Sequence, residues 1–168
     1  MTLLEWGISF AFWLHMVATV IWIGGLSALS LFIIPARQSL EPLAYLKLLD
    51  GIQRKLDPVS WFSLATLAAT GMFQLSSNPN YQGILVLNNR WAAAIFLKHL
   101  IFLAMTGISM YMSWGLFPKI RRVAFSSAKG LGSERDLPYS QIENRLIRLN
   151  FFLGILVLAL TAVARVSS

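Results

Sequence analysis

Cysteine is absent from this chain of 168 residues. Disulfide bonds, thiolate metal sites and cysteine nucleophiles are therefore excluded, and the redox compartment cannot be inferred from cysteine usage. Acidic residues are also scarce, since only seven Asp and Glu stand against 14 Lys and Arg. The sequence has no hydrolase triad, no paired catalytic carboxylates and no glycine-rich phosphate loop, so enzymes of those classes are not expected.

Apolar residues, in contrast, are abundant. Hydrophobic residues make up 57% of the chain and charged residues only 12%, with a mean hydropathy of +0.65. Soluble domains carry about 25% charged residues. The composition therefore predicts an integral membrane protein with a single domain over residues 1–168. A soluble alternative would need a partner that covers most of its surface.

The apolar residues gather in segments long enough to cross a bilayer, for which about 20 residues at 1.5 Å each are needed. Pro35 and Pro118 are expected to end the first and third segments, and the second is expected to begin after Pro58. Short connections between antiparallel segments predict an all-α, up-down bundle of four transmembrane helices. The expected spans are about residues 8–34, 59–75, 91–117 and 146–164.

Basic residues show how the spans are oriented. Lys and Arg gather in residues 35–58 and 118–145, whereas residues 76–89 contain none. Because basic loops stay in the cytoplasm, both termini are predicted to lie outside, in a multi-pass protein of the bacterial inner (plasma) membrane. The net charge of +7 is therefore attributed to residues that orient the protein in the membrane, and it does not indicate nucleic-acid binding. Leucines at helical spacing in residues 39–57 predict an amphipathic cytoplasmic helix between the first two spans, lying on the membrane or continuing the second span inward.

The sequence has only two histidines, His15 in the first span and His99 in the third. His15 precedes Ile34 by 19 residues and His99 precedes Phe117 by 18, which places both about 27–29 Å from the inner boundary. They are therefore expected at one level in the outer half of the protein. Lys98 lies beside His99, and ionisable residues inside a membrane are costly and often functional.

Three interpretations of the histidines remain open. In the first, a b-type haem is held between His15 and His99, since imidazole is a common axial ligand and helical bundles commonly hold cofactors. In the second, a copper ion is bound by the same histidines with the thioether of Met72. In the third, each histidine bonds a neighbouring hydroxyl or carbonyl group and only helps the helices to associate.

The haem interpretation makes further demands on the chain. A flat macrocycle needs a small neighbour such as Gly25 and a stacking ring such as Trp22. Its propionates need cationic partners, for which Lys98 and Arg165 are candidates on the outer half. Both basic side chains could instead reach outward to the membrane surface.

Two apolar stretches and one dipeptide resemble the copper-resistance protein D family. They are WLHMVATVIWIGGLSALSLFIIPA at 13–36, FLKHLIFLAMTGISMY at 96–111 and Thr70-Gly71. The resemblance implies copper uptake or resistance in a membrane. A looser similarity to HemJ-type protoporphyrinogen oxidases implies that His15 and Lys98 matter for haem binding and activity, with His99 as an additional ligand. Longer family members also carry external histidine and methionine clusters, which this chain lacks.

The favoured function is a membrane-bound redox metal centre, with b-type haem between the first and third spans, for electron transfer or service to a membrane complex. Copper transport or resistance is the alternative, followed by a cofactor-free structural subunit. Protoporphyrinogen-oxidase activity ranks last. The expected partners are the lipid bilayer and either another membrane complex or a second copy of the chain, without nucleic acid.

Overall fold

The computed structural model describes residues 2–78, 81, 83, 90–128 and 137–167, and within these ranges every regular element is helical. Four long helices dominate. Short segments follow two of them, including two π-helical turns, η1 and η2. The long helices are α1 (Leu3–Ala28), α3 (Pro42–Ser76), α4 (Arg90–Met110) and α6 (Leu137–Val166). The short segments are η1 (Leu29–Ile33), α2 (Ile34–Ala36), η2 (Tyr111–Leu116) and α5 (Phe117–Ala128).

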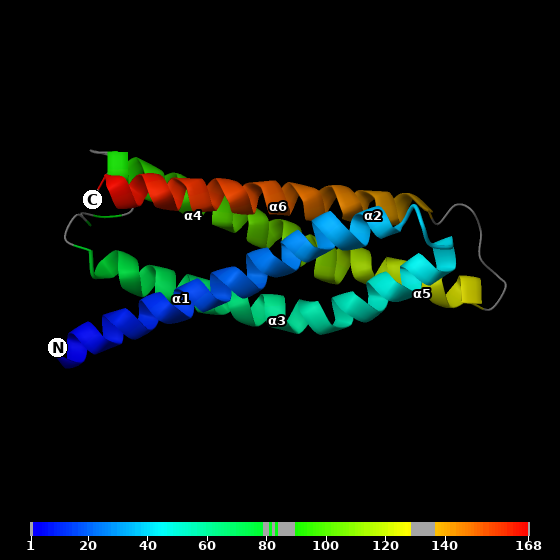
Figure 1. The fold of residues 1–168 in the computed structure, drawn as a ribbon, viewed down its shortest axis with the longest axis horizontal. Coiled ribbons are helices and arrows are strands. Elements are labelled where there is room, and N and C mark those ends of the chain that lie inside the picture. Colours follow the sequence, from blue (N-terminus) through cyan, green and yellow to red (C-terminus); the bar gives the residue numbers. More distant parts are fainter. Residues whose placement is uncertain (1, 79–80, 82, 84–89, 129–136, 168) are drawn as a thin grey trace.

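The long helices run in alternating directions along the molecule, so that both chain ends lie at the same end (Figure 1). Helix α1 packs mainly on α3, and α4 packs mainly on α6. A central apolar cluster joins the two pairs, with side chains of α6 packed against it. The buried members of this cluster are Ala18, Trp22, Leu26, Leu64, Leu67, Ile101 and Met105.

Three helical stretches are long and apolar enough to cross a membrane: Glu5–Ala36, Arg90–Arg122 and Gln141–Val166. This agrees with the membrane protein that the composition predicts. The expected span at residues 59–75 is not among them, because Ser, Thr and Gln side chains lower the hydropathy of that part of α3. The polar residues concerned are Ser60, Ser63, Thr66, Thr70 and Gln74.

Pro35 and Pro118 do not end their helices, so the predicted ends at residues 34 and 117 were wrong. A π-helical turn comes just before each proline, where Ile34 donates its N–H to the Leu29 carbonyl and Phe117 donates to the Met112 carbonyl. These bonds span five residues instead of four. The wider turn accommodates a residue that has no N–H and that would clash with an ordinary helical turn. The helices therefore continue beyond both prolines, to Ala36 and Ala128.

Pro58 lies inside α3 and not at its beginning, which is a second correction. The amphipathic residues 42–57 are thus continuous with residues 59–76 in one helix and do not form a separate helix. Helix α6 likewise begins at Leu137, earlier than the predicted residue 146. Polar contacts hold both extensions together. The Tyr45 hydroxyl donates to Oδ1 of Asn144 at 3.1 Å, between residues that lie outside the spans expected from the sequence.

Candidate metal-binding site

His15 faces α3, where Thr70 fixes its imidazole ring. Nδ1 of His15 lies 2.8 Å from Oγ1 of Thr70. The hydroxyl of Thr70 donates its own proton to the Thr66 carbonyl at 2.6 Å. Because a threonine hydroxyl has a single proton, Nδ1 must carry the hydrogen of its bond with Thr70. His15 is thereby held as the tautomer in which Nε2 is unprotonated and can bind a metal ion.

Gly71 lets α3 approach the same ring closely. A Cβ atom at position 71 would lie 3.4 Å from Cε1 of His15, in direct contact with the imidazole. Larger side chains at this position would press on the ring. Thr70 and Gly71 together therefore provide a hydrogen-bond acceptor and a flat backing for His15.

His99 is held in the same tautomer by its own helix. Its Nδ1 lies 2.7 Å from the backbone carbonyl of Ile95, one turn earlier on α4. A carbonyl oxygen can only accept, so Nδ1 carries the proton and Nε2 keeps its lone pair. The two histidines of the chain are thus both prepared to bind a metal through Nε2.

The structure brings His15, Lys98 and His99 into one neighbourhood. Both Lys98 and His99 are close enough to His15 to interact with it electrostatically. Deeper in the protein, the edge contact of Trp22 with Phe102, at a centroid distance of 6.1 Å, holds α1 against α4. All three side chains are half-buried.

The other predicted site residues lie elsewhere. Trp22 is buried in the central cluster at 4% exposure, and Gly25 faces Leu56 of α3 one turn deeper. Arg165 is exposed near the end of α6. Met72 lies two residues after Thr70 on α3, and its side chain is 50% exposed on the surface of that helix. Within the described ranges, no three His, Asp or Glu side chains gather as a metal site.

Sequence reasoning expected a hydroxyl or carbonyl partner for each histidine, as in the third interpretation, but it did not identify Thr70 as the partner of His15. It also did not find which methionines are buried. Met105 and Met112 are buried, at 0% and 6% exposure, whereas Met16 and Met110 face outward at 67% and 41%. The signal for Thr70 was available in the polar residues spaced along residues 60–74. The burial of individual methionines, by contrast, depends on how the helices are turned.

The cavities lie in the other half of the molecule. One of about 450 Å³ opens between α3, η2, α5 and α6, and a smaller one of about 40 Å³ continues it towards the central cluster. Neither cavity is lined by His15 or His99. A haem between these histidines would thus have to open a space of its own between α1 and α4.

The family model described as Copper resistance protein D matches residues 51–164, which is more than half of the chain. The matched residues run from α3 to α6 and include Thr70, Gly71, Lys98 and His99. No curated protein and no solved structure matches the chain.

Proposed function

The chain belongs to the copper resistance protein D family, and on that premise we propose that it binds and transports copper(I) in a membrane, with His15 and His99 as the first ligands. One observation carries the proposal: histidines of two helices, close enough to interact electrostatically, both present an unprotonated Nε2. Two imidazoles suit Cu(I), which accepts few ligands, better than Zn²⁺, which takes three or four protein ligands. Copper(I) titration of the purified protein should give one bound ion for each chain.

Buried thioethers offer a route away from the histidines. Met105 of α4 and Met112 of η2 lie seven residues apart, about 10 Å along the helix axis, and both are buried. Met105 belongs to the central cluster, and Met112 lines the smaller cavity beyond it. Thioether sulfur is a soft ligand that favours Cu(I). The two methionines therefore support movement of the ion from the histidines towards the opposite end.

Copper is preferred to b-type haem for three reasons. The family is named for copper resistance, and neither of the two cavities described above is lined by a histidine. The residues expected to accommodate haem are also apart, because Trp22 is committed to the central cluster and Arg165 is exposed at the end of α6. Lys98 beside the two imidazoles would repel a bound cation and so favour its release.

The protein is proposed to cross the inner membrane four times, as one domain with both termini outside. Helix α3 qualifies as the remaining span because its polar groups are satisfied internally. Thr70 bonds His15, Thr66 bonds the Phe62 carbonyl and Gln74 bonds the Ala11 carbonyl. The outer side of the helix presents Phe62, 75% exposed, which is suited to lipid.

Labelling of single cysteines tests this topology, and the cysteine-free sequence provides a clean background. Gln38→Cys and Ser77→Cys place exposed thiols before and after α3. In intact cells, a membrane-impermeant maleimide should label Ser77→Cys, whereas Gln38→Cys should react only after the membrane is broken. Equal labelling of both in intact cells would show that α3 does not cross, and the opposite pattern would reverse the orientation.

Thr70→Val tests the role assigned to the hydroxyl. Valine keeps the size of threonine but cannot accept from Nδ1, so His15 should lose its fixed tautomer. The affinity for copper(I) is expected to fall about 10–100-fold, as for other partners of metal-bound histidines. Competition with a chromogenic copper(I) chelator measures this change.

The matched control is Thr66→Val, because the hydroxyl of Thr66 bonds only its own helix. Thr70→Ser should restore the affinity, since serine keeps the acceptor. An unchanged affinity in Thr70→Val would contradict the role given to this bond.

A further inference from the structure

The cavity of about 450 Å³ is lined on its inner side by polar groups of three elements. Gln53 and Asp57 come from α3, Ser113 from η2 and Glu143 from α6. Gln53, Asp57 and Ser113 also line the smaller cavity. These four side chains are called the cavity floor below.

Glu143 is fully buried, at 0% exposure, and only one of its carboxyl oxygens is satisfied. Nε2 of Gln53 donates to Oε1 at 3.1 Å. Oε2 has no hydrogen-bond partner in the part of the chain that the structure describes, and Glu143 takes no part in the ion pairs between α3 and α5. A buried carboxyl group offsets the cost of burial either by holding its own proton or by contact with a positively charged or hydrogen-donating species in the cavity.

Asp57 adds a second carboxyl group to the floor. It lies one helical turn after Gln53 and accepts a short hydrogen bond from the Ser113 hydroxyl. Nε1 of Trp61 donates in turn to the oxygen of Ser113 at 3.3 Å, which fixes the position of the serine. Asp57 of α3 and Glu143 of α6 therefore line the same cavity.

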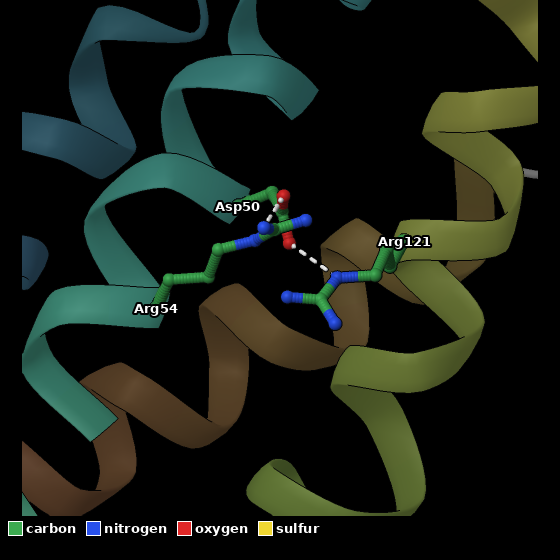
Figure 2. Close-up of polar contacts among 3 residues, drawn as sticks. All are labelled: Asp50, Arg54 and Arg121. Carbon is green, nitrogen blue, oxygen red and sulfur yellow. Dashed lines mark hydrogen bonds and ion pairs between the residues drawn. The ribbon is translucent and has the colours of Figure 1, made fainter. Parts of the chain in front are cut away.

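The rim of the cavity carries three arginines, Arg54, Arg121 and Arg122, and one acidic residue, Asp50. Asp50 lies between two of the guanidinium groups, with Nε of Arg54 and Nε of Arg121 each 3.1 Å from a different carboxylate oxygen (Figure 2). Neither Asp57 nor Glu143 forms an ion pair with a described side chain of the cavity lining.

We propose that the cavity floor binds a hydrated divalent cation of the Mg²⁺ kind through the carboxylates of Glu143 and Asp57. Mg²⁺ is held by one or two carboxylates and keeps several of its waters. Water occupies about 30 Å³ per molecule, so the cavity has room for an ion with its water shell. The lining offers oxygen and nitrogen but no histidine or methionine, which suits a hard cation and not Cu(I). The site is therefore separate from the proposed copper ligands.

The test is direct binding of Mn²⁺, a paramagnetic substitute for Mg²⁺, to the full-length, copper-free protein in detergent. Electron paramagnetic resonance should show one saturable site that excess Mg²⁺ displaces. Glu143→Gln is expected to weaken binding at least tenfold, and Asp57→Asn to weaken it several-fold. Glu41→Gln removes an exposed carboxylate at the beginning of α3 and should bind as the wild type does.

Only variants with the helix content of the wild type by circular dichroism are compared. If Glu143→Gln does not fold, Asp57→Asn decides the question. Absence of a saturable site overturns the proposal, and so does unchanged affinity in the folded floor variants. A protein whose unfolding midpoint responds to pH but not to Mg²⁺ would show that protons alone neutralise the floor, which also overturns it. Because copper is absent throughout, the result does not depend on the copper site.

Discussion

Replacing His15 or His99 by alanine should remove high-affinity copper(I) binding. Each substitution deletes one of two imidazoles whose Nδ1 is already protonated and whose Nε2 is available to a metal. Loss of an outer partner costs 10–100-fold in metal affinity, so loss of a ligand should cost more than about 100-fold. Competition with a copper(I) chelator and elemental analysis of the purified variants measure the effect.

Met16→Ala is the control for both histidine variants, because Met16 follows His15 but is 67% exposed. It should bind copper(I) as tightly as the wild type. His15→Met should keep part of the affinity, since thioether sulfur also binds Cu(I). Histidine variants that bind copper normally would contradict the site. A Soret band in the wild type that disappears in both alanine variants would instead assign the histidines to b-type haem.

Met105→Leu should slow copper transfer while leaving binding at the histidines intact. Leucine nearly conserves the volume of this fully buried side chain, so the central cluster should keep its packing. The thioether, however, is lost. If sulfur stabilises the ion in transit by about 1.4 kcal/mol, the rate falls about tenfold. Copper(I) uptake into proteoliposomes measures the rate, and chelator competition measures the binding.

Met110→Leu is the matched control, because Met110 lies on the same helix but is 41% exposed. Its transport rate should equal that of the wild type. Met112→Leu should resemble Met105→Leu, since Met112 is also buried. Equal rates in all three variants would exclude the buried methionines as the route and leave the histidines as a binding site without a defined exit.

The sequence predicts the helical membrane character and the family, and both are confirmed by the apolar helices and the family match. It does not predict how the helices end. Prolines such as Pro35 and Pro118 normally indicate helix ends, because proline lacks an N–H and clashes with the preceding helical turn. A π turn before each proline relieves this clash, and residue propensities do not predict such a turn. The extensions of α3 before residue 59 and of α6 before residue 146 could not be predicted for a different reason. They are stabilised by contacts between residues far apart in the sequence, such as Gln53 with Glu143, 90 residues apart.

The sequence indicates the candidate site because the chain contains only two histidines. Two histidines in apolar segments stand out, and helical rise places them at one level. Their tautomers were not predictable, because the proton position on His15 depends on how Thr70 is bonded to Thr66. The position of Met72 depends on the rotation of α3, which hydropathy leaves undetermined. Residue types thus indicate the chemistry, and helix rotation decides which residues take part.

The π turns occur at matching places in the two halves of the chain. In each half, a long histidine-bearing helix meets a π turn and a proline, and a long helix then returns alongside it. His15 precedes Pro35 by 20 residues, and His99 precedes Pro118 by 19. The two histidines therefore stand at nearly the same distance, along their helices, from a π turn.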